Sequence, residues 1–238
     1  MSGGLHAIVF GLFGTLVPSG SRERRDAVSH AMADDLGVDR VLFAELFKNS
    51  FRERWRGALG SLEETIAALA VRAGGNPTEE AVRRAARRRL DFTRRQITPD
   101  PGLPALLDAL RADGRRLGLI SNCSAEVPAL WDGNPLSRQI TAPVFSCTVG
   151  CCKPDPQIHR LAAAALDTVP ERCVFVADGA GGELPGAQAV GMQTIRVRAD
   201  GVDHGVYGGM GNWEGTTVDT LYDLPAVLGG RNTGRTRR

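Results

Sequence analysis

Lysine is almost absent from this sequence of 238 residues, because Lys48 and Lys153 are the only lysines among 29 basic side chains. The formal net charge is only +2, so bulk charge gives no argument for binding nucleic acid or an acidic membrane. No apolar run approaches the roughly 20 residues that span a bilayer, and the segment Met1 to His6 has no basic stretch. We therefore expect a cytoplasmic protein that binds neither nucleic acid nor a membrane.

Paired cysteines are also lacking. The cysteine count of five is odd, and two of the five, Cys151 and Cys152, are adjacent, which argues against a disulfide framework. With Cys147 they form a cluster without the paired CxxC spacing of a zinc site. We expect these thiols to be packing residues. The histidines at positions 30, 159 and 204 are scattered, so no Ser/His/Asp or Cys/His unit is predicted.

Residues 19–98 contain no convincing strand. Glycine-rich breaks divide them into four expected helices, at about 21–36, 39–57, 62–73 and 78–97. Ser61 and Glu64 have the spacing of a capping box for the third helix, and Thr78 is a suitable N-cap for the fourth.

The fourth expected helix carries a run of arginines, which could be an anion-binding face or a solvated one. Glu79 and Glu80 precede Arg83 and Arg84 by four residues, the spacing of helical ion pairs, and this favours the solvated face. The arginines in question are Arg83, Arg84, Arg87, Arg88 and Arg89.

Strands alternate with helices through the rest of the chain. A buried strand is expected within residues 5–17, and others at 116–121, near 143–147, at 173–177 and at 193–198. The intervening helices are expected at 103–113, near 125–131, at 155–167, at 183–190 and near 218–228. This alternation predicts an α/β fold with a Rossmann-like parallel sheet core and an inserted α-helical cap.

The predicted boundaries follow from this pattern. The core comprises residues 1–18 and 99–228, the cap residues 19–98, and a disordered basic tail residues 229–238. Residues 201–216, which include Tyr207 and Trp213, are rich in glycine and are expected to form a surface loop. We see no internal repeat.

Ligands of open α/β sheets bind at the carboxyl ends of the strands, so the residues that follow the expected strands are the candidates for a functional site. The segments there begin at Gly11, Ser121, Lys153 and Asp178; they read Gly11-Leu12-Phe13-Gly14-Thr15-Leu16, Ser121-Asn122, Lys153-Pro154-Asp155-Pro156, and Asp178-Gly179 followed by Glu183. In this order they resemble the four motifs of the haloacid dehalogenase-like (HAD) hydrolase superfamily, in the subgroup with a helical cap after the first motif. The resemblance runs from about residue 6 to 228.

The resemblance implies a nucleophilic aspartate at the position of Gly11. Glycine has no side chain that could act as nucleophile, general base or metal ligand. Phe13 stands where the phosphatases of the family have a second aspartate, although Phe or Tyr is normal there in some branches. By the same resemblance Phe13, Thr15, Ser121, Asn122 and Lys153 belong to the substrate-binding set, and Lys153 also to the catalytic one.

The fourth motif implies a magnesium site in which Asp178 is catalytic and metal-binding, with Glu183 as the second carboxylate. Asp178 could instead only cap the following helix. Since Gly11 supplies no carboxylate, we expect Mg²⁺ to bind weakly or not at all, and no other cofactor. We also expect the loss to leave Lys153 without its usual partner, in a pocket that is neutral or cationic and favours a small anionic ligand.

Three functional interpretations remain open. The first is a repurposed HAD-fold enzyme that acts on a small molecule by non-phosphatase chemistry. The second is a non-catalytic small-molecule binding or regulatory protein. The third is an ordinary phosphatase or dehalogenase silenced by the change at position 11. In each case the usual phosphatase or dehalogenase activity is expected to be absent or weak, and the protein is expected to be a monomer or homodimer.

Overall fold

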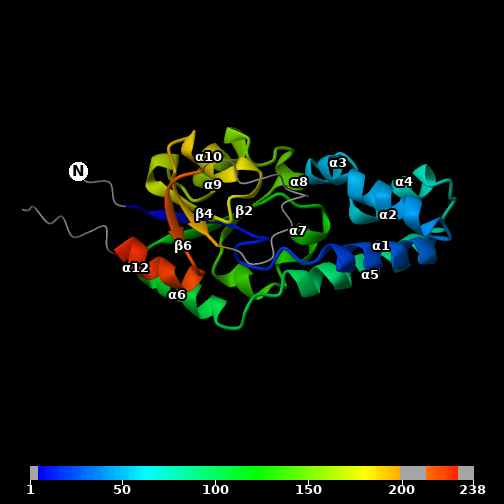
Figure 1. The fold of residues 1–238 in the computed structure, drawn as a ribbon, viewed down its shortest axis with the longest axis horizontal. Coiled ribbons are helices and arrows are strands. Elements are labelled where there is room, and N and C mark those ends of the chain that lie inside the picture. Colours follow the sequence, from blue (N-terminus) through cyan, green and yellow to red (C-terminus); the bar gives the residue numbers. More distant parts are fainter. Residues whose placement is uncertain (1–4, 199–212, 230–238) are drawn as a thin grey trace, which may run out of the picture.

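The computed structural model of the protein describes residues 5–198 and 213–229. Its centre is a six-stranded parallel sheet with the strand order β3-β2-β1-β4-β5-β6 (Figure 1). The strands are β1 Ala7–Gly11, β2 Arg116–Ser121, β3 Ala142–Phe145, β4 Cys173–Ala177, β5 Gln193–Val197 and β6 Thr216–Val218. The α/β class with a Rossmann-like parallel sheet, predicted from the alternation of strands and helices, is confirmed.

Helices cover both faces of this sheet, as parallel strands buried on both sides require. One face packs on α6 (Leu103–Ala112), α7 (Glu126–Trp131) and α12 (Leu224–Gly229), and the other on α9 (Pro156–Ala165) and α10 (Glu183–Gln188). Strand β1 lies between β2 and β4 in the interior of the sheet, and all five of its residues are buried. The short elements are α8 Ser146–Val149 and the 3₁₀ turns η1 Pro135–Arg138, η2 Pro170–Arg172, η3 Ala180–Gly182 and η4 Leu221–Asp223.

The segment between β1 and β2 is helical and extends beyond one end of the sheet (Figure 1). We call its five helices the helical block: α1 Arg22–Leu36, α2 Arg40–Asn49, α3 Phe51–Trp55, α4 Leu62–Arg72 and α5 Glu79–Gln96. Its apolar side chains, among them Met32, Phe43 and Ile66, form a core of their own. The helical block is the segment that we predicted to be a cap.

Local signals for helix ends were accurate. Ser61 and Glu64 form the predicted capping box of α4, and the Thr78 side chain accepts a hydrogen bond from the backbone N–H of Ala81 at the start of α5. The expected helix 39–57 was wrong in one respect, because it is broken at Ser50 into α2 and α3.

The C-terminal part departs most from expectation. The expected helix near 218–228 begins only at Leu224, and Thr216–Val218 instead form β6 at the edge of the sheet. Trp213 packs against the core, so the end of the predicted surface loop is not free of the sheet. Tyr207, most of that loop and the predicted tail lie outside the described residues.

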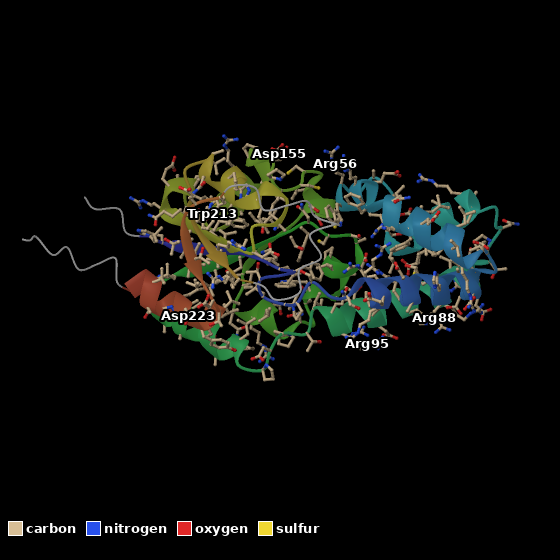
Figure 2. The ribbon with its side chains drawn as sticks, viewed as in Figure 1. Arg56, Arg88, Arg95, Asp155, Trp213 and Asp223 are labelled. Carbon is tan, nitrogen blue, oxygen red and sulfur yellow. The ribbon has the colours of Figure 1, made fainter. Side chains whose placement is uncertain are left out.

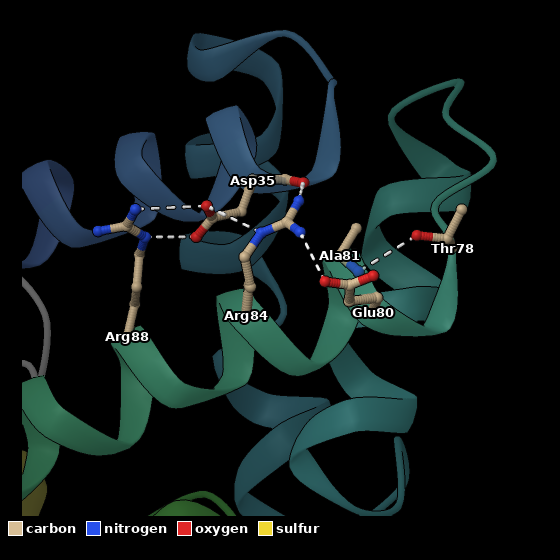
Figure 3. A network of polar contacts seen from close by, with 6 residues as sticks. All are labelled: Asp35, Thr78, Glu80, Ala81, Arg84 and Arg88. Carbon is tan, nitrogen blue, oxygen red and sulfur yellow. Dashed lines mark hydrogen bonds and ion pairs between the residues drawn. The ribbon is translucent and has the colours of Figure 1, made fainter.

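The arginine face of α5 is largely a solvated ion-pair surface. Arg83 and Arg84 pair with Glu79 and Glu80 at the predicted spacing. Figure 3 shows that Arg84 and Arg88 also share Asp35 at the end of α1, which ties the two longest helices of the block together. The last arginine of the run, Arg89, does not belong to this surface.

Candidate functional site

Gly11 is the last residue of β1 and pairs with Ile120 in the regular parallel register. Its backbone is not in the left-handed region, so the main chain does not require a glycine here. A β-carbon built on Gly11 would lie 2.9 Å from the Thr15 hydroxyl and 3.4 Å from the β-carbon of Ala177. Thr15 would have to shift slightly to admit a larger residue. The backbone conformation at position 11 therefore does not account for the glycine.

Gly14 shows what a required glycine looks like in the same loop. Its φ is +74°, and a β-carbon there would lie 2.1 Å from a carboxylate oxygen of Asp178. Both the conformation and the contact exclude a side chain. The loop has thus kept the glycine that brings it against Asp178, while the neighbouring position 11 carries no functional group.

Two buried hydroxyl groups lie around this strand end without nitrogen or oxygen partners. The hydroxyl oxygens of Thr15 and Ser121 are inaccessible to solvent, and no nitrogen or oxygen atom of a described residue is hydrogen-bonded to either; the Cys123 thiol is the neighbour of the Ser121 hydroxyl. Ser121 is 2% exposed. Buried hydroxyls are normally paired, because an unpaired one costs on the order of 1–3 kcal/mol. The family resemblance assigns both side chains to ligand binding, but only Ser121 lies in the wall of the adjoining cavity.

Lys153 lies in the loop before α9, held by Asn122. The Asn122 side chain donates to the Lys153 carbonyl at 3.0 Å and accepts from its backbone N–H at 2.8 Å. The lysine ammonium pairs with Glu183 at 2.5 Å, and both side chains are about nine-tenths buried. Lys153 thus has no carboxylate partner at position 11, where the family resemblance implies one, but it is paired with Glu183 at the start of α10.

Glu183 and Asp178 form a carboxyl pair beside this lysine. The side chain of Glu183 accepts from the Gly179 backbone N–H, and that of Asp178 from Ala180, so Asp178 does cap the turn after β4. Burial raises the pKa of Glu183 to about 7, with Asp178 adding to the shift and Lys153 opposing it. Two carboxyl groups and one ammonium group thus share this buried cluster.

These residues do not fit a magnesium site. Mg²⁺ favours an octahedron of oxygen ligands that includes one or two carboxylates free to bind it. Here Glu183 is bound to Lys153, and position 11 offers no oxygen from a side chain. Within residues 5–198 and 213–229, no group of three or more His, Cys, Asp or Glu side chains could hold a metal ion.

The strand-end residues open into a cavity of about 670 Å³, which we call the strand-end cavity. Phe13, Ser121, Asn122, Lys153, Asp178 and Glu183 line it, whereas Gly11 and Thr15 are not in its wall. From the other side it is closed by Phe51, Arg52, Trp55 and Arg56 of the helical block. Arg56 and Asp155 mark its rim in Figure 2. Its ionisable wall residues are three basic and three acidic, so this cavity has no excess charge.

A second cavity of about 460 Å³, the block cavity, adjoins the first under α1, α2 and α5. The two share Phe13, Ser19, Phe51, Arg52, Trp55 and Asn122. The basic residues of the block cavity are Arg22, Arg25, Lys48, Arg52, Arg54 and Arg89, against the acidic Asp26 and Glu126. An excess of basic wall residues is therefore found in the block cavity, whereas the cavity around Lys153 has equal numbers of basic and acidic residues.

A buried ion cluster in the block cavity joins the helical block to the sheet. Glu126 of α7 is 2% exposed and pairs with Arg89 at 2.8 Å. Burial alone would raise its pKa, but Arg89 and Arg54 together hold that pKa below its ordinary value. Arg54 also donates to Ser124 at 2.6 Å and stacks over the Phe47 ring. No pattern in the sequence predicts this cluster, and our assignment of Arg89 to a solvated face was wrong.

Both the sequence and the fold are similar to those of known proteins. Residues 5–191 match the family of haloacid dehalogenase-like hydrolases. The chain belongs to this family. A glyceraldehyde 3-phosphate phosphatase of Methanopyrus kandleri is 27% identical over 200 residues, which cover 82% of this chain and 84% of that protein. The 2-haloacid dehalogenase structure from Pseudomonas syringae pv. Tomato superposes with a TM-score of 0.71 at 21% identity, over 95% of this chain and 99% of that one.

Another relative matches only part of this chain. The mouse acyl-CoA dehydrogenase family member 10 is 32% identical over 108 residues, 44% of this chain, but this chain spans only 10% of that protein. In the part of the chain that the structure describes, no helix has the length and apolar character of a membrane span. Family and fold are thus established, and the ligand and the reaction are a matter for proposal.

Proposed function

We propose that this HAD-family protein is a repurposed enzyme that acts on a small anionic molecule without a covalent aspartyl intermediate. The observation that carries the proposal is Gly11. It stands at the strand end where the family resemblance implies the nucleophile, in a regular backbone conformation that does not require a glycine, although Thr15 would have to shift to admit a side chain. Nothing in the backbone explains the glycine, so its effect is the removal of a nucleophile and metal ligand.

The surviving residues still form a binding site. Ser121 offers a buried hydroxyl in the cavity wall, and the loop of Lys153 is fixed by two hydrogen bonds with Asn122, one donated and one accepted by the Asn122 side chain. A site that no longer bound anything would gain stability from apolar substitutions at such positions, because unpaired buried polar groups are costly. Lys153, Asp178 and Ser121 are the groups that would give electrostatic or acid/base assistance to a bound molecule.

The charge distribution supports an anionic ligand. The strand-end cavity is balanced, but the adjoining block cavity has six basic and two acidic wall residues. A ligand that occupies both would place its reacting part near Lys153 and an acidic part under the helical block. Phe51 and Trp55, which line both cavities, would contact the body of such a ligand.

Calorimetric titration with inorganic phosphate and with 2-chloropropionate, without Mg²⁺, tests the anion site. We expect binding by the parent protein and by Arg83→Ala, and loss of binding in Lys153→Ala and Arg52→Ala. The two arginine variants are matched, since Arg52 lines both cavities whereas Arg83, on the exposed face of α5, lines neither. Equal binding by all four proteins, or binding that requires Mg²⁺, would contradict the proposal.

The second interpretation, a protein that binds without turnover, is favoured by the buried ion cluster of Arg54, Arg89 and Glu126. This cluster fixes the helical block on the sheet and would slow the exchange of a ligand beneath it. Incubating the bound ligand with the protein and following it by NMR separates the two interpretations. New signals that disappear in Lys153→Ala support the enzyme, and an unchanged ligand supports the binding protein.

A further inference from the structure

Two cysteines lie side by side where the sheet meets the helical block. Cys123 follows β2 by two residues and Cys147 follows β3 by two. Ser121 and Phe145 are the last residues paired in the parallel register of these strands, so the segments that carry the two cysteines leave the sheet side by side. The Ser146 hydroxyl, next to Cys147, accepts from the Cys123 backbone N–H at 3.0 Å and donates to its carbonyl at 3.3 Å. The main chains are therefore held together at this point.

The thiols themselves are in contact, since each is the hydrogen-bonding neighbour of the other. Cys123 is 2% exposed, whereas Cys147 is partly exposed. Burial raises the pKa of the Cys123 thiol well above its usual range. The hydrogen bond from Cys123 lowers the pKa of Cys147, against a smaller opposing effect of burial. One thiol is thus accessible and activated, and the other is positioned behind it, as attacking and resolving thiols are.

Both cysteines are tied to the functional site. Cys123 lines the block cavity and directly follows Asn122, whose side chain holds the loop of Lys153. The Cys147 carbonyl lies against Gly57 at the end of α3, where a β-carbon on Gly57 would come within 2.2 Å of it. A bond between these sulfurs would join the Asn122 loop to α8, on which the end of the helical block rests.

We propose that Cys123 and Cys147 form a reversible disulfide under oxidising conditions, which fixes the joint between the sheet and the helical block. The oxidant is a low-molecular-weight disulfide. The Cys147 thiolate attacks one of its sulfurs and forms a mixed disulfide, and the released thiolate takes up a proton. The Cys123 sulfur, losing its proton to solvent, then attacks the Cys147 sulfur and expels the second small thiol. Two electrons pass from the protein thiols to the small disulfide, which becomes two thiols.

The remaining cysteines of the chain provide controls. Cys152 lines the strand-end cavity and contacts the Trp55 carbonyl, and Cys173 is buried in β4. The hydrogen bonds of these two thiols go to other groups: that of Cys152 to the Trp55 carbonyl and that of Cys173 to the Val169 carbonyl. Cys152→Ser and Cys173→Ser should therefore leave the proposed disulfide intact, and Cys147→Ser and Cys123→Ser should remove it.

The test is intact-mass measurement and peptide mapping of the native protein after incubation with oxidised glutathione. We expect the loss of two hydrogen atoms, a single linked peptide pair containing Cys123 and Cys147, and reversal by dithiothreitol. The unfolding temperature of the oxidised protein should rise by roughly 5–10 °C, because the bond closes a loop in the unfolded chain. Cys147→Ser should show neither change.

Three outcomes would overturn the proposal. They are an unchanged mass, a stable glutathione adduct on Cys147 without a linked pair, and a linked pair that involves Cys151 or Cys152 in place of Cys123. Because the parent protein is mapped directly, the result does not depend on whether the buried Cys123→Ser variant folds. It is also independent of the identity of the ligand.

Discussion

The two sides of the ligand cavity differ in their charged groups and in how those groups are paired. On the strand-end side, a buried cluster of Lys153, Glu183 and Asp178 stands beside two hydroxyls without nitrogen or oxygen partners and a strand end without a side chain. On the helical-block side, arginines are in excess, and those nearest the sheet are bound to Glu126 and Ser124. Position 11 at the strand end carries no functional side chain, while on the block side Arg89 and Arg54 are held by Glu126 and Ser124.

The largest effect should come from removing the cation on the strand-end side. Lys153→Ala leaves Glu183 and Asp178 buried without an ammonium, and breaking such a pair costs about 3–5 kcal/mol. The folded-state pKa of Glu183, already raised to about 7, would rise further. A raised carboxyl pKa lowers stability as pH rises through the range from its unfolded value to its folded value. Urea unfolding should therefore show a larger loss at pH 8 than at pH 5.

The other lysine is the control for that variant. Lys48→Ala should change the free energy of unfolding by less than about 0.5 kcal/mol at either pH, since it is an exposed residue. Equal effects of the two lysine variants would mean that the strand-end cluster is not held by Lys153.

A nearly equal effect is expected on the block side from Glu126→Gln. The change leaves Arg54 and Arg89 close together without a buried anion, at a cost of about 2–4 kcal/mol. Arg84→Ala, which breaks ion pairs on the exposed face of α5, should cost less than about 1 kcal/mol. Chemical denaturation of the three proteins checks this. If Glu126→Gln is no more harmful than Arg84→Ala, the helical block is not anchored by the cluster.

A smaller effect on stability is expected from the protonation of a buried histidine. His159 of α9 is fully buried against Phe175, and neither ring nitrogen has a partner among the described residues. Burial, helped by Lys153, lowers its pKa to about 3. The histidine in the unfolded chain, with a pKa of about 6.5, takes up a proton below that pH, whereas the buried histidine in the folded protein does not until pH is near 3. The free energy of unfolding therefore falls as pH decreases from about 6.5 toward the folded-state pKa. The parent should lose about 2 kcal/mol between pH 8 and pH 5 through this residue.

His159→Leu should remove that loss, because leucine takes up no proton and has no polar atoms to bury. The unfolding free energy of the variant and of the parent, measured across the same pH range, should converge at pH 8 or favour the variant, and diverge at pH 5. A parent and a variant with parallel pH profiles would show that His159 does not titrate as its burial implies.

Much of the sheet side could be predicted from sequence because its signals are local. The buried run before Gly11 and the turns after Ser121 and Asp178 are short patterns, and the parallel sheet brings their carboxyl ends to one edge. The break at Ser50 was missed because Arg40 to Trp55 has continuous helical composition. Strand β6 was missed because three residues carry too little periodicity to be recognised.

The block side could not be predicted because its contacts are distant in sequence. Arg89 and Glu126 are 37 residues apart, and Arg54 and Ser124 are 70 apart. Nothing in the helical spacing of Arg89 distinguishes it from its solvated neighbours. The pairing of Lys153 with Glu183 has the same origin, since sequence shows which residues follow the strands but not which of them meet.

The most direct test of the account is hydrolysis of p-nitrophenyl phosphate and 2-chloropropionate, with and without Mg²⁺, by the parent and by Gly11→Asp. Loss of a covalent nucleophile costs on the order of 10⁴–10⁶ in turnover. We predict that the parent with Mg²⁺ is no faster than Lys153→Ala, whereas Gly11→Asp binds Mg²⁺ measurably in calorimetry and hydrolyses one of the substrates slowly. Robust Mg²⁺-dependent turnover by the parent protein would contradict the claim that position 11 has ended the family's covalent chemistry.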